Sequence, residues 1–262
     1  MGYQPKYLYP NYKGTRGATQ EPLKQQFITI ENMLQNMGFS VFFDDIYEAD
    51  DIIGSIVQKI EIESGDDTPA IYVITKDHDY LQLIDDCTRL WLIQKDQETA
   101  DKLIEKYYNL SELGLTKEVL NLPAKTFEFT PDTCFAEFGV WPWQIPDLKG
   151  IQGDSSDNIP GIKGVSSAAI PLLKEYSTLE GIIDAVNMED ERLLKGFWKN
   201  DLGILRSPIK AIKEYQNIGL LSKDLATIRR DYPLPELSSL EFIFDKNRCR
   251  EELFKYEIKS IL

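Results

Sequence analysis

The stretch Gly153-Asp154-Ser155-Ser156-Asp157-Asn158-Ile159-Pro160-Gly161 brings two acids, an asparagine and a Pro-Gly turn together within nine residues. Asp154 and Asp157 are three positions apart, so they would face one site if they begin a helical turn. A structural Asx-turn followed by a hairpin is the alternative, because aspartate and asparagine favour turns as well. We interpret the stretch as a pair of acids held for a common site.

A glycine-rich turn follows at once, at Gly161-Ile162-Lys163-Gly164-Val165. Gly161 and Gly164 permit a tight backbone that exposes amide N–H groups, which can bind an anion such as a phosphodiester. Ser166 and Ser167 then begin a helix, whose positive end adds to phosphate affinity. The combination predicts a phosphate-binding turn beside the acid pair.

Two further acid clusters lie upstream, each beside a secondary-structure signal. Asp77-His78-Asp79 follows the apolar run 70–75, and ligands of α/β sheets bind beyond the carboxyl ends of strands. Glu48-Ala49-Asp50-Asp51 opens a helical pattern in which Glu48 and Asp51 share a face. Each cluster alone also fits a structural role, as capping aspartates or as acids that complement a helix dipole. If the clusters meet, their crowded carboxylates need a cation, and Mg²⁺ or Mn²⁺ suits hard oxygen ligands.

The apolar pattern of residues 1–149 predicts strands that alternate with helices. The expected strands are Phe39–Phe43, Ala70–Thr75 and Arg89–Ile93, and the expected helices are Leu23–Met37, Tyr47–Glu63 and Tyr80–Ile84. This alternation is typical of an α/β domain with a parallel sheet. Residues 95–129 interrupt it, and we interpret them as a peripheral insertion with one helix, Thr99–Leu110.

The remainder, residues 150–262, is predicted to form a second, mostly helical domain. The helices expected near and beyond the boundary are Pro131–Phe138, Gln144–Ile151, Leu179–Val186, Leu193–Trp198 and Ile209–Asn217. Residues 240–262 are expected to close the chain with a strand-like piece and a helix.

Composition places the chain among globular proteins and leaves its partners open. No stretch of about 18 apolar residues exists, so no membrane span is expected, and no secretory signal is seen. Three widely spaced cysteines favour reduced thiols and a cytoplasmic location. The net charge of −14 argues against nucleic acid as a partner, but binding depends on local patches such as the basic residues of 13–16.

Five motifs in the same order resemble the 5′-nuclease family, which contains the 5′–3′ exonuclease domain of bacterial DNA polymerase I and its phage flap-endonuclease and RNase H relatives. Residues 153–161 resemble that family's GDxSDNIPG segment, within a helix–three-turn–helix. The other four are Tyr9–Arg16, similar to YPxYKxxR; Glu48–Gly54, similar to EADDxIG; Thr75–Leu83, similar to TGDKDxxQL; and Leu221–Ile228, similar to LSRKLATI.

The resemblance implies a PIN-like parallel sheet flanked by helices, and hydrolysis of DNA phosphodiesters near 5′ ends or flaps with two Mg²⁺ or Mn²⁺ ions. The matching metal ligands are Glu48, Asp50, Asp51, Asp77, Asp79, Asp154 and Asp157. Lys13 and Arg16 match basic residues that contact the scissile phosphate, and Gly161, Lys163, Gly164, Val165 and Ser166 match the turn that grips duplex DNA. The resemblance also implies a monomer in a bacterial or phage-infected cell, with K⁺ at the hairpin turn and RNA of RNA–DNA hybrids as further candidates.

The sequence departs from the family pattern in three places. The family begins with a strand ending in an aspartate and has another aspartate before the first motif, and this chain shows neither. The turn after Gly164 is shorter and lacks a lysine, and His78 stands where the family has lysine. A surface or packing role is expected for His78.

These departures leave three hypotheses open. The first is an active metal-dependent 5′ nuclease, and the second is a DNA-binding module without catalysis. The third is one half of a split nuclease, which would need its N-terminal part in trans.

Overall fold

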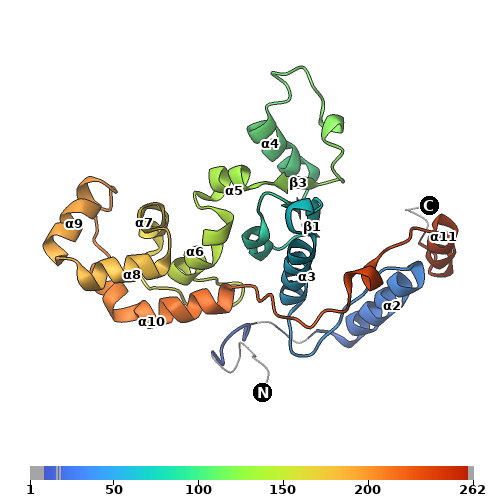
Figure 1. Cartoon of the computed structure of the whole chain (residues 1–262), viewed down its shortest axis with the longest axis horizontal. Coiled ribbons are helices and arrows are strands. Elements are labelled where there is room, and N and C mark those ends of the chain that lie inside the picture. The colour runs from blue at the N-terminus through green and yellow to red at the C-terminus, as the bar shows by residue number, and fades with distance from the viewer. Residues whose placement is uncertain (1–8, 16, 18, 259–262) are drawn as a thin grey trace. The chain divides into compact units, whose positions relative to one another are not determined.

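The structure is a computed structural model that describes residues 9–15, 17 and 19–258 of the chain. These residues belong to two compact units (Figure 1). The first contains residues 17, 19–63 and 229–258, and the second contains residues 9–15 and 64–228. The boundary expected between residues 149 and 150 lies inside a helix of the second unit, and that division into domains stays a prediction. Among the described helices, none combines the length and apolar character that crossing a bilayer requires.

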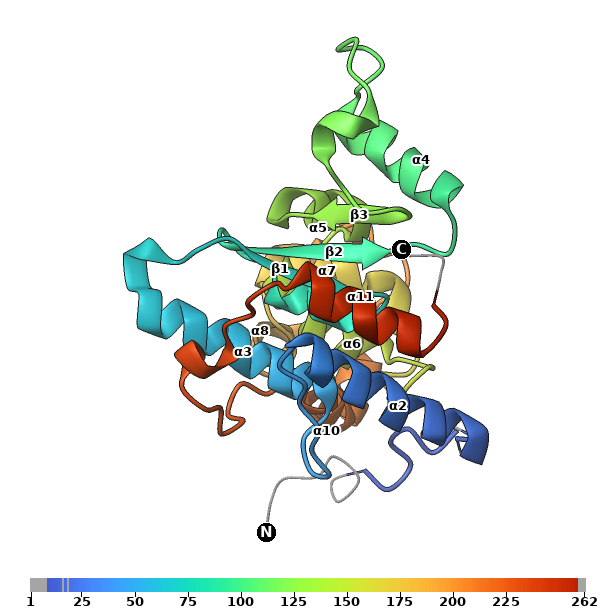
Figure 2. The same cartoon turned by 90° about the vertical axis from the view of Figure 1, so that its right-hand side faces the viewer.

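The first unit is helical in its described residues. Its elements are α2 (Glu21–Met37), α3 (Ala49–Ser64), the 3₁₀ turn η6 (Leu237–Leu240) and α11 (Lys246–Lys255). The predicted C-cap of α2 is confirmed, because Gly38 has a left-handed φ of 99° and its N–H donates to the Gln35 carbonyl. α11 packs against α2, and the two helices lie side by side in Figure 2.

The prediction of two strands in this unit is wrong. Residues 39–43 form no strand, and Phe39 stacks face to face on Phe242 with ring centroids 4.2 Å apart. The piece that follows Leu240 is likewise not a strand, and it leads to Asp245, whose side chain caps α11. A residue of high β-propensity is favoured in a strand that pairs with a neighbouring strand. Neither segment has such a neighbour among the described residues, so neither forms a strand.

The second unit holds a three-stranded mixed sheet among its described residues. β1 (Ile71–Thr75) pairs in parallel with β2 (Thr88–Ile93), and β2 pairs antiparallel with β3 (Thr126–Phe129). Figure 2 shows β2 and β3 as neighbours. The prediction of an α/β fold is therefore confirmed, whereas the prediction of a wholly parallel sheet is wrong.

β3 also corrects the interpretation of residues 95–129 as a peripheral insertion. Phe127 and Phe129 are fully buried on one face of the sheet, and their rings meet edge to face at 4.7 Å. α4 (Gln97–Tyr108) packs against this strand, with Tyr107 and Tyr108 beside Phe127. The last residues of the segment belong to the core, because the TFEF strand β3 follows the charged helix and connector. The overall charge of the segment obscured this strand in the sequence.

The rest of the second unit is helical, as predicted. Its α-helices are α5 (Pro131–Phe138), α6 (Ile145–Gln152), α7 (Ala169–Tyr176), α8 (Leu179–Met188), α9 (Glu191–Asn200) and α10 (Ile209–Ala226), and its 3₁₀ turns are η1 (Gly65–Asp67), η2 (His78–Leu83), η3 (Lys117–Leu120), η4 (Pro142–Gln144) and η5 (Ser166–Ala168). α10 runs to Ala226, beyond the predicted end at Asn217. η2 is a 3₁₀ turn in place of the short helix expected at 80–84.

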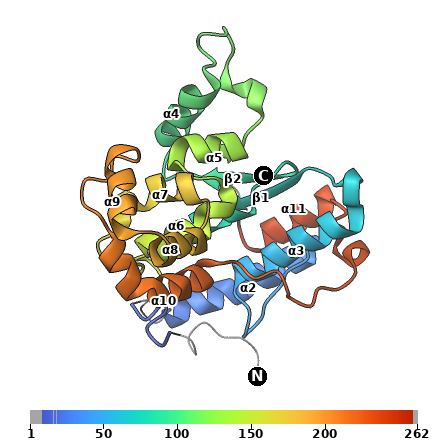
Figure 3. The ribbon, with the colours of Figure 1, turned by 60° about the vertical axis from the view of Figure 1, so that its left-hand side comes forward.

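α6 and α10 are the most closely packed helix pair, and glycines make their approach possible. α10 lies along α6 and α8 in both Figure 1 and Figure 3. A Cβ on Gly150 would lie 2.9 Å from the Cβ of Lys223 and 3.1 Å from the Gly219 carbonyl oxygen. A Cβ on Gly219 would lie 2.7 Å from Ile162, which is itself buried. The contact thus holds the loop after α6 directly against α10.

Buried polar groups complete this contact. Asp147 on α6 is 2% exposed, accepts the N–H of Leu179 at 2.7 Å, and pairs with the Lys223 ammonium at 2.7 Å. Ser222 on α10 is fully buried, and its hydroxyl accepts the N–H of Gly161 at 3.0 Å. Because unpaired buried polar groups cost free energy, these bonds make one relative placement of α6, α8 and α10 preferred.

Replacing Gly219 with alanine is expected to lower the free energy of unfolding by about 1–3 kcal/mol, because the added methyl overlaps the buried Ile162 side chain. Urea unfolding followed by circular dichroism measures the change. The matched control is Gly196→Ala in α9, where a Cβ would meet nothing within 4 Å. That substitution should raise stability, by up to about 1 kcal/mol, through helix propensity alone. Equal effects of the two substitutions would contradict the close approach of α6 and α10.

Candidate functional site

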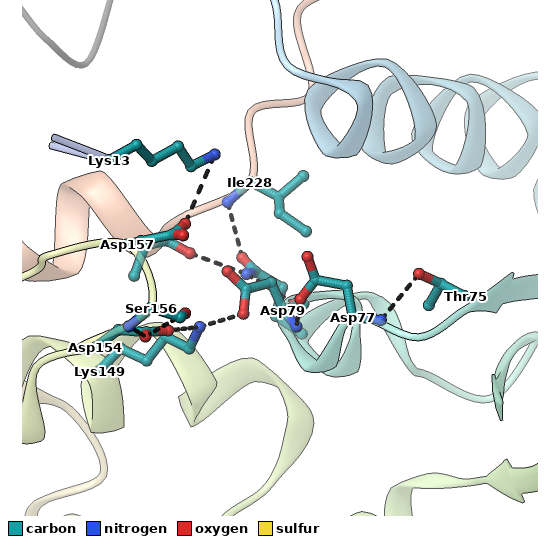
Figure 4. Close-up of polar contacts among 11 residues, drawn as sticks. Lys13, Thr75, Asp77, Asp79, Lys149, Asp154, Ser156, Asp157 and Ile228 are labelled. Carbon is teal, nitrogen blue, oxygen red and sulfur yellow. Dashed lines mark hydrogen bonds and ion pairs between the residues drawn. The ribbon is translucent and has the colours of Figure 1, made fainter. Parts of the chain in front are cut away.

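The acids after β1 are held by the turn that they begin. The N–H of Asp77 donates to the Thr75 hydroxyl at 3.1 Å, and the Asp77 carboxylate accepts the N–H of Asp79 at 3.0 Å. Asp77 is therefore the cap of η2, as the structural alternative from sequence also proposed. The Asp79 carboxylate turns away from this cap and toward α6 (Figure 4).

A buried glutamine ties this turn to the end of α10. The Gln82 side chain donates to the Ala226 carbonyl at 3.0 Å and accepts the N–H of Ile228 at 2.9 Å. These two bonds engage both ends of the amide across 144 and 146 residues of sequence. The loop that carries Asp77 and Asp79 is thereby fixed against the helical part of the same unit.

Asp154 lies in a short hairpin turn, not at the start of a helical turn. The backbones of Asp154 and Ile159 exchange two hydrogen bonds of 2.9 and 2.7 Å, which close the loop between them. One carboxylate oxygen of Asp154 accepts the N–H and the hydroxyl of Ser156, at 2.8 and 2.6 Å. The other oxygen is directed to α6. Asp154 and Asp157 therefore do not begin a helical turn, and the Asx-type turn that the sequence left as the alternative is present, because these local bonds favour it over a helix.

Lys149 on α6 joins the two acid loops, and motif reasoning missed it. Its ammonium contacts the Asp79 carboxylate and lies 2.6 Å from the Asp154 carboxylate (Figure 4). The three side chains are only 15–16% exposed. The available signal was a lysine five residues before Asp154 in a helix that ends at the acid loop.

The environment of the cluster shifts the pKa values of its members in opposite directions. Burial raises the pKa of Asp79, and the Lys149 charge offsets this only in part. Burial acts the same way on Asp154, but hydrogen bonds from Lys149 and Ser156 overcome it and hold the pKa of Asp154 at about 2. Burial lowers the pKa of Lys149, but the two carboxylates outweigh it and leave the pKa above its usual value. Near neutral pH the cluster therefore holds one ammonium and at least one firmly ionised carboxylate.

The cluster opens to solvent at an accessible depression of about 530 Å³. The residues that line it come from the end of β1, from η2, from α6 and from the hairpin turn: Thr75, Lys76, Asp77, His78, Asp79, Lys149, Asp154 and Ser156. Two acid motifs separated by more than 70 residues therefore share one concave surface. His78 is exposed and its ring packs edge-on against Phe138 at 6.1 Å, in agreement with the expected surface or packing role.

Lys13 approaches the second acid of the hairpin turn. Its ammonium is 3.6 Å from the Asp157 carboxylate, and its N–H donates to the Asp157 carbonyl at 2.8 Å. The Asn158 side chain donates to the Asn11 carbonyl at 2.7 Å, and Tyr12 is buried against Ile159. The first motif therefore packs on the acid hairpin through backbone, polar and apolar contacts. Arg16, predicted with Lys13, lies outside the described residues.

The acids of the EADD motif belong to the first unit. Asp51 is 8% exposed, and its two oxygens accept the N–H groups of Arg229 at 2.9 Å and of Glu48 at 3.2 Å. Burial raises the pKa of Asp51, and these hydrogen bonds act against the rise. Asp50 accepts the N–H of Asp51 at 3.0 Å. Asp51 thus has a clear structural contribution, since it holds the chain at Arg229 to the first turn of α3.

The predicted phosphate-binding turn is divided between core and surface. Gly161 has a left-handed φ of 63°, and its N–H is taken by Ser222, while the Val165 side chain is buried. Lys163, Gly164 and Ser166 are exposed, and Gly164 is also left-handed at 82°. The tight backbone expected from the glycines is present, and its outward side consists of Lys163, Gly164 and Ser166.

The donor atoms of the cluster are of the kind that a divalent cation binds. Asp79 and Asp154 offer carboxylate oxygens on either side of a position that already holds a positive charge, which is the chemistry that Mg²⁺ and Mn²⁺ accept. Within the described residues of the second unit, however, no three acids, histidines or cysteines gather closely enough to share an ion. A cation held by this pair would complete its coordination with other ligands.

The chain is similar in sequence to known proteins. Residues 5–108 match the N-terminal resolvase-like domain of the 5′-3′ exonuclease family, and residues 140–246 match its C-terminal SAM fold. DNA polymerase I of Bacillus caldotenax is 29% identical over 246 residues, which cover 94% of this chain and 23% of that protein. DNA polymerase I of Caldicellulosiruptor bescii is 32% identical over 263 residues, which cover 98% of this chain and 26% of that protein. The chain thus spans about a quarter of the length of these relatives.

Solved structures share the fold. The phage T5 5′-exonuclease with bound zinc ions has a TM-score of 0.58 at 15% identity, covering 98% of this chain and 80% of that one. The phage T5 flap endonuclease, in a pseudo-enzyme–product complex with DNA and metal ions, has a TM-score of 0.58 at 16% identity and the same coverage. The two matched domains together cover most of the chain, and the chain belongs to the 5′–3′ exonuclease family.

Proposed function

We propose that this chain is a metal-dependent 5′ nuclease that hydrolyses DNA phosphodiesters near 5′ ends or at flaps. The observation that carries the proposal is the convergence of Asp79 and Asp154, from two distant motifs, on one cation at an open depression. Structural acids are usually satisfied by neighbours within their own turn, as Asp77 is here. Two acids that share a cation across a concave surface are more typical of a site for an ion or a phosphate ester.

In this proposal Asp79 and Asp154 hold a Mg²⁺ or Mn²⁺ ion. The ion would supply Lewis-acid stabilisation of the charge that develops on the phosphate oxygens. Asp77 lies in the same turn as Asp79, and Asp157 lies in the same turn as Asp154. On the strength of their motifs, we propose as further ligands these two acids and the EADD acids Glu48, Asp50 and Asp51. The Ser156 hydroxyl and N–H keep the Asp154 carboxylate oriented and ionised.

Lys13 is proposed to contact the scissile phosphate, and Arg16 is proposed with it from the shared motif. The Lys13 ammonium is 3.6 Å from Asp157, so a positive charge lies directly beside the acid hairpin. A phosphate bound there would exchange part of that ion pair for its own contact with lysine. The backbone bond from Lys13 to the Asp157 carbonyl fixes the point from which the side chain extends.

Duplex DNA is proposed to bind at the exposed side of the turn after Gly161, with α6, the loop 153–165 and α7 as the helix–three-turn–helix. Lys163, Gly164 and Ser166 offer one charge, an open backbone and a hydroxyl to the phosphates. Such contacts position a duplex without reading its bases, so no sequence specificity is expected. With a net charge of −14, binding must depend on such local groups and weaken steeply with salt.

A DNA-binding module without catalysis is the second candidate, and Lys149 is the observation that favours it. The lysine already neutralises part of the charge on Asp79 and Asp154, so this pair does not require a metal ion to be stable. Cleavage assays separate the two candidates. The module would bind flap substrates and leave them intact at every Mg²⁺ or Mn²⁺ concentration.

Asp154→Asn is expected to reduce cleavage of a 5′-flap duplex by roughly 100-fold or more, because loss of a ligand exceeds the 10–100-fold cost of losing an outer-shell partner. Single-turnover cleavage of a labelled flap with Mg²⁺ measures the rate, and fluorescence anisotropy with Ca²⁺ checks that binding persists. Asp201→Asn, at an exposed acid just after α9, is the matched control and should cleave normally. Equal rates for all three proteins would exclude Asp154 from the site.

Lys163→Ala is expected to weaken duplex binding to a similar extent for every sequence and to reduce the slope of log affinity against log salt by about 1. The physical reason is the loss of one phosphate contact at the exposed turn. Anisotropy titrations at several salt concentrations measure the slope. Lys199→Ala on α9 removes an equally exposed lysine away from the turn and should leave the slope unchanged. A sequence-dependent loss would contradict backbone recognition.

A further inference from the structure

We infer that Lys149 is a built-in counter-cation, which occupies the place of the divalent ion between Asp79 and Asp154 and must be displaced when that ion binds. The inference rests on the cation site of the proposed function and does not depend on cleavage. The ammonium contacts both carboxylates at once, and it is the group that joins the two acid loops in the second unit (Figure 4).

The position of the lysine makes it a competitor for these oxygens. Its ammonium uses Asp154 Oδ2, while Asp154 Oδ1 is occupied by Ser156. It also contacts Asp79 Oδ1, on the carboxylate that faces α6. A metal ion that binds both carboxylates would approach the same oxygens. The Lys149 ammonium and the metal ion would then lie close together and repel each other strongly, because the site is half-buried.

The contacts of Lys149 also explain why Asp79 and Asp154 can lie close together without a metal ion. Asp79 and Asp154 are each about five-sixths buried, and two such carboxylates without a cation would repel and favour protonation of one of them. The lysine holds them in place, so the loops keep a common geometry before an ion arrives. This arrangement lowers the affinity of the site for the metal ion, because the bound lysine must move before the ion binds.

The helix lets the ammonium move while the lysine backbone stays fixed. Lys149 lies in the last turn of α6, and its carbonyl accepts the N–H of Gly153, the residue that begins the acid hairpin. Gly153 has a left-handed φ of 76°, and a Cβ there would lie 2.6 Å from the Ile159 carbonyl oxygen. These contacts hold the backbone in place, whereas the flexible four-carbon side chain borders the open depression.

Lys149→Met keeps the apolar stem and removes the charge. It is expected to bind Mn²⁺ roughly tenfold more tightly than the wild type, a factor that corresponds to about one pKa unit of interaction. Isothermal titration calorimetry of the metal-free proteins with Mn²⁺ measures the affinity. The metal-free variant should also melt at a lower temperature than wild type, and Mn²⁺ should raise its melting temperature more.

Three further variants define the result. Lys149→Arg keeps a cation and Lys199→Met removes a distant one, so both should bind Mn²⁺ as the wild type does. Adding Asp154→Asn to Lys149→Met should abolish the tightened binding. Unchanged or weaker Mn²⁺ binding by Lys149→Met overturns the inference, and so does tightened binding that survives Asp154→Asn.

A measurement on the wild type covers the case in which Lys149→Met fails to fold. Acetylation of lysines by a limiting amount of an amine-reactive acetyl donor, followed by peptide mass spectrometry, reports which lysine side chains are accessible. Mn²⁺ should increase modification of Lys149 and leave that of Lys199 unchanged. No increase at Lys149 with Mn²⁺ bound overturns the inference. Absence of flap cleavage alongside the Mn²⁺ response would overturn the proposed nuclease and leave the role of Lys149 standing.

Discussion

The structure of the candidate site depends on charge compensation between one lysine and two aspartates. Asp79 and Asp154 come from loops that follow a strand and a helix, and the Lys149 ammonium is what lets them lie together in a half-buried place. A buried carboxylate without a partner is costly enough that it protonates or moves toward solvent. One ion cluster therefore links both loops, and any metal ion that binds there enters a site whose charge is already partly balanced.

The scaffold around the cluster explains why these loops have little freedom. The glycines of α6 and α10 allow their backbones to approach closely, and Ser222 accepts the Gly161 N–H across that contact. Gln82 ties the acid turn after β1 to the end of α10 by two hydrogen bonds. Described residues of four of the five family motifs, all but EADD, thus contact one another within the second unit.

Several predicted site residues have structural contacts that the motifs alone do not reveal. Asp77 caps η2, Asp51 holds Arg229 to α3, and the Gly161 N–H is consumed inside the core. A carboxylate with a backbone bond still has lone pairs for a cation, so a cap and a ligand can be one residue. Substituting such residues would change local structure as well as chemistry. Asp154 is the cleaner probe, because the bonds that its carboxylate accepts come from Ser156 within its own turn and from the Lys149 side chain, which belongs to the site itself.

The sequence by itself determined the α/β class, most helices, the glycine cap of α2, and the acids that follow β1 and α6. These features depend on local periodicity, local turn chemistry and motif order, all of which neighbouring residues carry. Only the tertiary structure decided the antiparallel pairing of β3, the loss of the strand expected at 39–43, and the position of Lys149. Each of these depends on which distant group lies opposite, and a strand or a buried charge is defined by its partner. Lys149 has no unusual neighbours in sequence. Its contribution to the site can be recognised only in the fold, where α6 places its ammonium between two carboxylates.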